Sequence, residues 1–422
     1  MSQFELLPLG ASQFDTGARP LHWSRTGAST GFISGNLDWT LTRLGASHAV
    51  AADLLRICAG AYLADRLTSR GQIFTRTIEL TVHVTEMAAW TADAVGQVAH
   101  LLWWLTGDDW TVRVVLAERG EAFEPPAQPP VSEVVLLSGG LDSLCGAVDR
   151  LNDGTSRLFL SHADGTTAVQ YAQRRIRDWL TERAATPPEF LAVTFAQAGA
   201  KSESSSRSRS LLFAALAAAT ATAHGASRVV VPENGYTSIN PPLTTARGGA
   251  LSTRSTHPTT FAYINQLLAT LGIGVALDDP YLGLTKGELV AQAAAKADAT
   301  AFAQVVATSL SCGKLDGTYY KGGNPNYSCG LCVPCIVRRA SITAAGLDDL
   351  TPYLIDTLPA VSRPRLIANR SDDVQAVQEA LFRGISEDEL LACGPWPSSF
   401  DLDAAVALCA RALQEIALVP LP

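Results

Sequence analysis

Short apolar runs alternate with amphipathic stretches through the middle of the chain. Four such runs, VVLLS, RLFLS, FLAVTF and RVVVP, lie between residues 134 and 232, and each precedes a helical stretch, such as 168–183 or 208–224. Short continuous apolar strands that alternate with helices are typical of a parallel sheet with both faces covered. The pattern therefore predicts an α/β fold with a doubly wound parallel sheet.

The N-terminal part of the chain has a different pattern. Residues 78–84 and 112–116 alternate apolar and polar positions, and a helical stretch of about 91–105 lies between them. Residues 121–133 hold four prolines and no periodic apolar pattern, which is typical of a domain boundary. The predicted organisation is a small α/β domain (1–125), a proline-rich linker (126–133), the doubly wound domain (134–350) and a helical extension (351–422) with helices at about 371–383 and 402–417.

Six of the eight tryptophans lie in the first 125 residues. Aromatic residues of a small domain are mostly buried, so most of the six are expected in its core. Trp103 and Trp104 are adjacent, and adjacent residues of a helix cannot both face one side. At least one of them is therefore a candidate for exposure and for an anchor in an interface. We expect residues 1–125 to bind a partner protein; a domain that only dimerises the chain is the alternative.

Composition and charge narrow the classes of function. A chain of 422 residues with 47% hydrophobic and 17% charged residues is long enough to bury ordinary globular cores. The formal net charge of −8 argues against direct binding of nucleic acid or of an anionic membrane surface. The apolar run over 211–223 is shorter than the roughly 20 residues of a membrane span and predicts a buried helix. Residues 1–10 do not resemble a secretory signal, so we expect a cytoplasmic protein.

The hexapeptide SGGLDS directly follows the first strand of the predicted doubly wound domain and opens a helix. Backbone N–H groups and the positive end of a helix dipole then point at one spot, which suits a phosphate. The glycines permit close approach, and Asp142 is placed to hold a Mg²⁺ ion that the phosphates share. An ordinary glycine turn is the alternative. The predicted nucleotide-binding residues are Ser138, Gly139, Gly140, Leu141, Asp142 and Ser143.

Half of the eight cysteines lie in one short stretch. Cys312 is followed, after sixteen residues, by a Cys-x2-Cys-x2-Cys motif. Four thiolates with these spacers can close a tetrahedral zinc site, whereas an iron–sulfur cluster or free thiols are the alternatives. Four protein ligands leave no open position for water, so the expected zinc is structural. The predicted zinc knuckle covers 312–335, with Cys312, Cys329, Cys332 and Cys335 as ligands.

The SGGLDS segment resembles the PP-loop of the Rossmann-like ATP pyrophosphatases, which cleave ATP between the α and β phosphates. The chain has no GxxxxGK[ST] sequence, so the chemistry of P-loop kinases and GTPases is disfavoured. Together with SLSC and SCGLCVPCIVRRASITAAG, the SGGLDS segment makes residues 132–346 similar to the 7-cyano-7-deazaguanine synthase (QueC) family. The resemblance implies ATP, Mg²⁺ and Zn²⁺ as cofactors and a deazapurine carboxylate as substrate.

Two further segments carry this resemblance. Arg209 with the following LLF resembles the arginine segment of the family, although Ser210 stands where the family has Asn. Lys286 stands in a Thr-Lys-x-Glu helix start, where a capped N-terminus would bring it within reach of triphosphate oxygens. A solvated surface lysine is the alternative. The resemblance thus implies Asp142, Ser143, Arg209 and Lys286 as catalytic residues.

The candidates for substrate recognition are less specific. The segment after the fourth strand matches the substrate-reading segment of the family only loosely, around Asn234 and Tyr236. Arg254 and His257 lie in a loop beside the expected pocket, where they would read a carboxylate. His162, after the second strand, would face the adenine or the substrate, and a hydrogen-bonded structural histidine is its alternative.

The long N-terminal part and the stretch after 346 have no counterpart in the housekeeping enzyme. An elongated QueC-like chain of this kind resembles the QueC-type components of bacterial antiphage operons, in particular the QatC family of the Qat system. The resemblance implies a ligase that adenylates 7-carboxy-7-deazaguanine, releases pyrophosphate and transfers the acyl group to the N-terminal amine of a partner protein from the same operon. Synthesis of 7-cyano-7-deazaguanine with ammonia and a non-catalytic ATP-sensing scaffold are the alternatives.

Overall fold

The structure is a computed structural model that covers most of the chain. The first residue of the predicted linker and the last seven residues of the predicted N-terminal domain lie outside the described residues. The described ranges are 2–27, 29–71, 75–118, 127–163, 166–204, 207–244 and 253–422.

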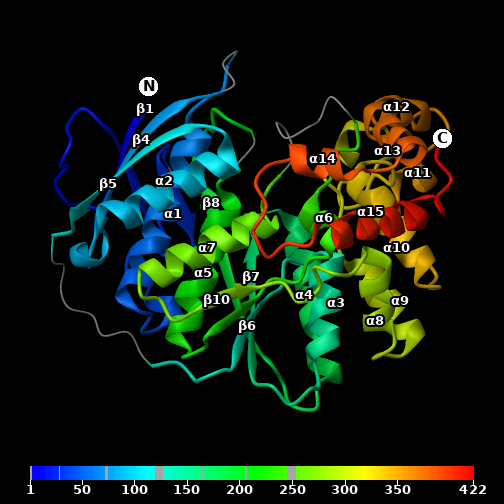
Figure 1. The fold of residues 1–422 in the computed structure, drawn as a ribbon, viewed down its shortest axis with the longest axis horizontal. Coiled ribbons are helices and arrows are strands. Elements are labelled where there is room, and N and C mark those ends of the chain that lie inside the picture. Colours follow the sequence, from blue (N-terminus) through cyan, green and yellow to red (C-terminus); the bar gives the residue numbers. More distant parts are fainter. Residues whose placement is uncertain are drawn as a thin grey trace.

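Ten strands of the described residues form one continuous sheet (Figure 1). All neighbouring strands run parallel except β3 and β8, so the predicted α/β class with a mostly parallel sheet is confirmed. The strands are β1 (Ser2–Leu6), β2 (Arg19–Trp23), β3 (Phe32–Gly35), β4 (Thr77–Val84), β5 (Asp109–Leu116), β6 (Glu133–Leu136), β7 (Arg157–Ala163), β8 (Glu189–Gln197), β9 (Arg228–Val230) and β10 (Ala276–Asp278).

The sheet consists of two halves with the same strand order. The N-terminal half runs β3-β2-β1-β4-β5 and the second half runs β8-β7-β6-β9-β10, so each half has the order 3-2-1-4-5 when its own strands are counted. This is the order of nucleotide-binding α/β folds, whose ligands bind at the carboxyl ends of the first and fourth strands. The halves meet where β3 and β8 pair antiparallel, with Ser34 opposite Ala196.

Helices cover one face of the N-terminal half. The apolar residues of β4, such as Ile78 and Leu80, share a core with α1 (Ala49–Leu67) and α2 (Ala92–Thr106), whereas Thr111 and Arg113 of β5 are exposed. A sheet with one covered face produces the alternation of apolar and polar residues that predicted β4 and β5. The helical pattern between them predicted α2. The pattern did not predict β1 to β3, which are five residues or fewer, or α1, which is buried nearly all round.

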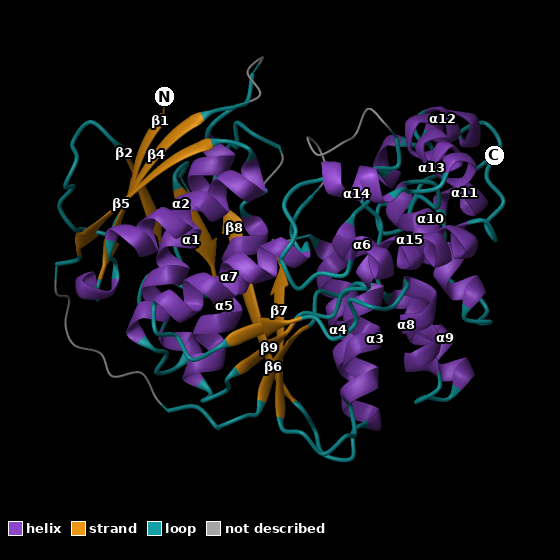
Figure 2. Ribbon diagram, viewed as in Figure 1, coloured by secondary structure: helices purple, strands orange, loops and turns teal. Residues whose placement is uncertain are grey.

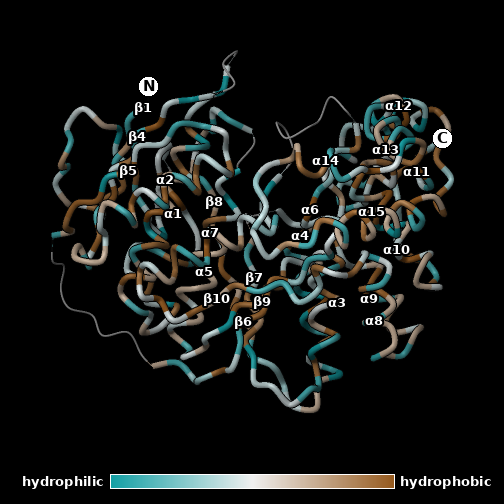
Figure 3. The backbone as a smooth tube through the Cα atoms, in the orientation of Figure 1, coloured by the Kyte–Doolittle hydropathy of each residue, from teal (hydrophilic) through white to brown (hydrophobic). Residues whose placement is uncertain are grey.

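The two halves share one hydrophobic core. α1 packs against α5 (Arg209–Ala223), the buried helix that the apolar run predicted, and residues of both helices belong to one buried cluster. Apolar residues gather along α5 and α7 (Pro258–Thr270) beside the sheet (Figure 3). Because α1 covers α5, the N-terminal half is part of the packing of the second half. Whether residues 1–125 bind a partner stays a prediction.

The second half of the sheet is covered on both faces (Figure 2). α5 and α7 cover one face, and a separate apolar core with Val135, Phe159 and Phe302 lies under the helices of the other. This arrangement matches the doubly wound pattern expected from the alternating strands and helices. The helices of the other face are α3 (Leu141–Arg150), α4 (Thr167–Arg183), α8 (Lys286–Ala294) and α9 (Ala299–Thr308).

The C-terminal residues gather as helices at one end of the molecule (right in Figure 1). They pack around an apolar core that includes Tyr236 and Ile239 of α6 (Gly235–Ile239). The predicted helices near 371–383 and 402–417 are confirmed as α13 and α15. Among the described helices, none has the length and apolar character that a membrane span requires. The helices of this region are α10 (Val333–Ala344), α11 (Leu354–Thr357), α12 (Arg363–Ala368), α13 (Ser371–Arg383), α14 (Glu387–Ala392) and α15 (Leu402–Ile416).

The pairing of β3 with β8 can be tested at Gly35. A Cβ atom at this position would lie 1.8 Å from the carbonyl oxygen of Thr194, so the strands cannot keep their spacing with any larger residue. We predict that Gly35→Ala lowers the free energy of unfolding by about 1–3 kcal/mol, as overpacking does. Gly96→Ala in α2 is the control, because its Cβ meets nothing within 4 Å and alanine stabilises a helix by up to about 1 kcal/mol. Denaturant unfolding measures both, and a Gly35→Ala protein as stable as the wild type would contradict the pairing.

Candidate functional site

The SGGLDS loop lies at the carboxyl end of β6, beside β9, where the strand order of the second half reverses. Gly139 has a φ of +90°, and a Cβ there would lie 3.1 Å from the Gln173 side chain. The Ser138 hydroxyl accepts a hydrogen bond from the Gly140 N–H (3.2 Å) and donates to the Ser143 hydroxyl (3.1 Å). Gly140 is the N-cap of α3 and offers no side-chain cap, so the first N–H groups of α3 are left for another acceptor.

Asp142 is the buried centre of the site. One carboxylate oxygen, Oδ2, accepts hydrogen bonds from Lys286 Nζ (2.7 Å) and Asn234 Nδ2 (3.1 Å). The other, Oδ1, is buried and accepts no hydrogen bond from an amine, amide, hydroxyl or backbone N–H of the described residues, and the carboxyl group of Glu233 lies within interaction distance of Asp142. Burial alone would raise the pKa of this carboxyl, but the Lys286 ammonium and the hydrogen bonds hold the pKa below its usual value. Asp142 is therefore a buried anion with one oxygen available to a further cation or donor.

Two more carboxyl groups lie close to Asp142. Burial, together with the charge of Asp142, raises the pKa of Glu233 well above its usual value. Burial raises the pKa of Asp279 to about 7, and the Asp142 charge acts in the same direction. Asp142 and Glu233 share the single ammonium of Lys286, and the raised pKa values of Glu233 and Asp279 indicate that the carboxyl groups outnumber the nearby cations, which favours a positively charged ligand. Carboxylate oxygens are the ligands that Mg²⁺ prefers, so the orphaned Oδ1 of Asp142 and the neighbouring Glu233 fit a divalent cation.

Lys286 is held in place by the C-terminal helix. Thr285 and Glu288 form the predicted capping box at the start of α8, and the buried Lys286 excludes the alternative of a solvated surface lysine. Glu415 of α15 accepts hydrogen bonds from the Gly287 N–H (3.0 Å) and from the Thr285 hydroxyl. The carboxylate thus lies at the positive end of α8, directly beside the residue that pairs with Asp142. No local sequence pattern indicates this contact, which joins residues 130 positions apart.

A cavity of about 360 Å³, cavity A, opens over this cluster. The SGGLDS loop, Glu233 and Lys286 form its polar wall, and the start of α10 forms part of its apolar wall. It is lined by Ser138, Gly140, Leu141, Asp142, Ser143, Pro232, Glu233, Tyr236, Thr237, Asn240, Pro241, Leu243, Thr253, Lys286, Leu310, Ser311, Val333, Pro334 and Val337.

A second cavity of about 510 Å³, cavity B, adjoins cavity A. The two share five lining residues: Ser138, Ser143, Pro232, Glu233 and Thr253. Cavity B extends toward α5 and α7, and the α2 residue Leu105 contributes to its wall. The predicted residues Arg209 and Arg254 line cavity B, together with Arg207, which the sequence analysis did not select. The SGGLDS loop therefore lies between two compartments.

Three predicted residues have structural contacts instead of lining either cavity. Asn234 caps α6, because its Oδ1 accepts from the Thr237 N–H (3.0 Å) while its amide donates to Asp142. The His162 ring packs against Phe213, with ring centroids 4.1 Å apart. His257 caps α7 and packs against Trp396, with ring centroids 4.4 Å apart. Burial, with the nearby Arg254, lowers the pKa of His257 to about 4.

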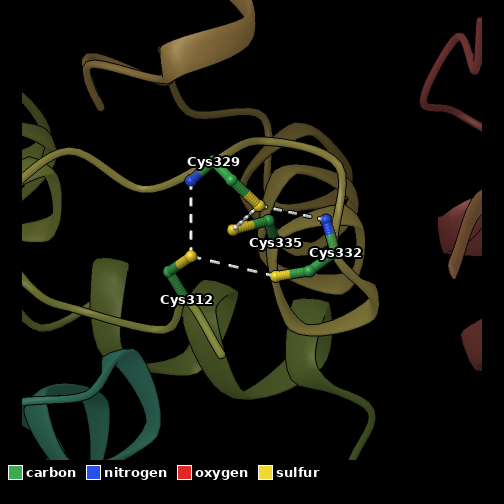
Figure 4. A group of neighbouring side chains, drawn as sticks. All are labelled: Cys312, Cys329, Cys332 and Cys335. Atoms are coloured by element: carbon green, nitrogen blue, oxygen red, sulfur yellow. Dashed lines mark hydrogen bonds between the residues drawn. The ribbon is translucent and has the colours of Figure 1, made fainter. Parts of the chain in front are cut away.

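The four predicted cysteines form one cluster (Figure 4). Their sulfur atoms lie within 4.8 Å of one another, and the Cys312–Cys332 and Cys329–Cys335 pairs are both 3.9 Å apart. A tetrahedral zinc ion with Zn–S bonds of about 2.3 Å requires sulfur–sulfur distances of about 3.8 Å. The Cys329 N–H points to the Cys312 sulfur (3.3 Å) and the Cys332 N–H to the Cys329 sulfur (3.2 Å), which suits thiolate acceptors. The predicted four-cysteine cluster is confirmed, and its geometry is compatible with zinc binding.

The cysteine cluster is connected to the SGGLDS loop. Cys332 is the N-cap of α10, whose first residues Val333 and Pro334 line cavity A. Further along α10, the buried Arg338 donates to the Ser309 hydroxyl (2.8 Å), and the adjacent Leu310 N–H donates to the Gly139 carbonyl (2.8 Å). A metal at the cluster would therefore hold α10 in place. This helix forms a wall of cavity A and contacts the segment that hydrogen-bonds to the SGGLDS loop.

Comparison with protein-family models and with curated proteins finds no match for this chain. The resemblance to the QueC family thus rests on the SGGLDS and cysteine motifs and on the residues around them.

We predict that the cluster binds one zinc ion per chain and that Cys332→Ser abolishes this binding. The variant should lose several kcal/mol of stability, because the binding free energy of a structural zinc contributes to folding. Cys393→Ser is the matched control, since Cys393 is a buried free cysteine outside the cluster and its variant should keep the metal. Metal analysis and thermal unfolding of both proteins provide the test. A metal-free wild type, or a Cys332→Ser protein of full stability, would contradict it.

Proposed function

We propose that this chain is an ATP-dependent enzyme that adenylates a carboxylate and transfers the acyl group to an amine. The observation that carries the proposal is Asp142: a buried carboxylate in the first turn of α3, paired with Lys286 through one oxygen, whose other oxygen has no cationic or N–H donor and lies beside the Glu233 carboxyl. A helix N-terminus without a side-chain cap suits a polyphosphate, and a buried acceptor next to it suits the metal ion that accompanies the polyphosphate. The resemblance of SGGLDS to a PP-loop indicates that ATP is cleaved between its α and β phosphates.

Each group of the cluster has a role in this scheme. The N–H groups at the start of α3 and the Ser138 and Ser143 hydroxyls bind the phosphates, and Lys286 neutralises part of their charge. Asp142 and Glu233 are the residues that would hold Mg²⁺, which stabilises the negative charge on the departing pyrophosphate. Asn234 orients Asp142, and Glu415 orients the helix start that carries Lys286.

The reaction consists of two substitutions. A carboxylate oxygen attacks the α-phosphorus, the bond to the oxygen that bridges the α and β phosphates breaks, and pyrophosphate leaves with that electron pair. The amine nitrogen then attacks the acyl carbon, AMP leaves with the electrons of the carbon–oxygen bond, and the nitrogen releases a proton. The two adjoining cavities support this sequence, since nucleotide and carboxylate must meet beside the SGGLDS loop. No side chain forms a covalent intermediate.

The substrate and the acceptor follow from the resemblance. We propose 7-carboxy-7-deazaguanine as the carboxylate and the N-terminal amine of a partner protein as the acceptor, in antiphage defence. An aromatic patch on α2 of the N-terminal half and the adjacent α7 supports a docking partner. Trp103 of α2 is 46% exposed, as expected for one of the two adjacent tryptophans, and Trp104 is buried. The Trp103 ring lies 5.2 Å from the ring of His100, which lies 4.9 Å from that of Tyr263 on α7.

We predict that ATP is converted to AMP and pyrophosphate and that Asp142→Asn slows turnover by at least about a hundredfold. The asparagine retains an oxygen that accepts from Lys286 and Asn234, so the fold should persist. Asp178→Asn on the exposed surface of α4 is the control and should keep full activity. Quantifying AMP and pyrophosphate provides the measurement. Release of ADP and phosphate would contradict the proposal, and nucleotide binding without turnover by the wild type would favour the scaffold alternative.

We predict that Trp103→Ala slows modification of the partner protein by about tenfold or more, because exposed aromatic anchors dominate interfaces. Exchange of labelled pyrophosphate into ATP with the free carboxylate should not change, since Trp103 lines neither cavity. Tyr171→Ala removes an exposed aromatic residue from α4 and is the control. A single substitution is preferable to deletion of residues 1–125, which would uncover α5. Protein docking would be contradicted if Trp103→Ala modified the partner protein at the wild-type rate. It would also be contradicted if ammonia served as an acceptor as well as the partner protein does.

A further inference from the structure

Cavity B is lined by more positively charged than negatively charged side chains. Three arginines, Arg207, Arg209 and Arg254, contribute to its lining, and Glu233 is the only carboxyl among the described lining residues. Glu233 also belongs to the carboxyl cluster around Asp142 and Lys286, so a single shared carboxyl faces three guanidinium groups. Most of the remaining wall is apolar and includes the rings of Phe213 and Phe261.

Two of these arginines are bound by the C-terminal end of α2. Arg254 Nη1 donates to the Trp104 carbonyl (3.0 Å), and its guanidinium carbon lies 3.9 Å from the centroid of the Trp104 ring. Arg207 Nη1 donates to the Thr106 carbonyl (3.3 Å). The last carbonyls of a helix have no partner within the helix and carry the negative end of its dipole, so they are suited to hold cations.

The backbone between Arg207 and Arg209 is bound by α1. Asp65 Oδ2 accepts from the N–H (3.2 Å) and from the hydroxyl (2.8 Å) of Ser208. Asp65 also pairs with Arg76 at 2.6 Å, within a buried network of ion pairs. The N-terminal half therefore positions arginines of cavity B through both of its helices, α1 and α2.

A bound anion would reduce the electrostatic repulsion between the guanidinium groups at cavity B. Burial and the neighbouring Arg70 lower the pKa of Arg207, and burial together with the charge of Arg207 lowers that of Arg254. The planar guanidinium binds carboxylate and phosphate groups through two parallel hydrogen bonds. A volume of about 510 Å³ falls within the range of small-molecule sites, and the walls carrying Phe213 and Phe261 suit a flat ring.

We propose that cavity B binds the anionic group of a ligand with a planar ring, and that the N-terminal half of the chain completes this site by holding Arg207 and Arg254. The inference rests on the proposed function for its choice of ligands. Two sources provide this chemistry: the carboxylate of the heteroaromatic substrate, and a phosphate of the nucleotide. Because cavity B shares Ser138 and Ser143 with cavity A, either ligand would lie beside the SGGLDS loop.

The test measures binding of two probes to the full-length protein by calorimetry. One probe is an ATP analogue with a non-hydrolysable α–β bridge, and the other is 7-carboxy-7-deazaguanine. Arg254→Gln and Arg207→Gln should each weaken binding of one probe by about tenfold or more, as expected for loss of a charge-assisted pair. Arg183→Gln, which removes an exposed arginine of α4, is the control and should change neither affinity.

A double-mutant cycle tests the contribution of α2. Trp104→Phe should weaken binding of the same probe as Arg254→Gln, because it alters the ring against which the guanidinium stacks. The double variant should bind no more weakly than Arg254→Gln alone, since Trp104 acts on the ligand through Arg254. Additive losses would show that Trp104 has only a general structural role and would overturn this part of the inference.

The outcomes separate the two proposals. If the arginine variants bind only the carboxylate probe more weakly than the wild type does, cavity B is the site of the substrate. If they bind only the ATP analogue more weakly, cavity B is the site of the nucleotide. If the wild type binds both probes and the arginine variants bind them equally well, the inference is wrong and the proposed function stands. If the wild type binds neither probe, both are wrong.

Discussion

The buried pair of Asp142 and Lys286 is the interaction on which the site depends. A carboxylate is costly to remove from water unless charges and hydrogen bonds compensate it, and here one oxygen is compensated while the other is not. Elements from distant parts of the chain meet at this pair: α3 carries Asp142, α8 carries Lys286, and Asn234 at the start of α6 donates to the carboxylate. Such an incomplete arrangement is expected where a ligand supplies the missing partner.

The parts of the chain outside the doubly wound sheet support this centre. α15 places Glu415 at the start of α8, and α10 connects the cysteine cluster with the segment that hydrogen-bonds to Gly139. On the other side, the N-terminal half extends the sheet by five strands in the same order and holds Arg207 and Arg254 at cavity B. The added regions therefore build the walls of the two cavities, in addition to any surface they offer to a partner.

Local patterns predicted much of this structure. Continuous apolar runs predicted four of the five strands of the second half, β6 to β9, but not the three-residue β10. The spacing of the cysteines predicted the cysteine cluster, and the Thr-Lys-x-Glu helix start predicted the position of Lys286. Contacts between distant segments could not be predicted in this way. Glu415 and Arg207 lie in ordinary polar positions of the sequence, and only packing brings them to the site. Glu233 could have been selected, because it is an acid at the carboxyl end of a strand at the switch point. His257 was selected for its chemistry, but the start of α7 uses it as a cap.

The central claim is that a carboxylate oxygen attacks the α-phosphorus of ATP, and oxygen transfer tests it most directly. The full-length protein is incubated with ATP, an amine acceptor and a carboxylate substrate in which both carboxyl oxygens are ¹⁸O. The account predicts that each AMP released with the amide carries one ¹⁸O in its phosphoryl group, while the second label stays in the amide. Unlabelled AMP, or label in inorganic phosphate, would contradict the account.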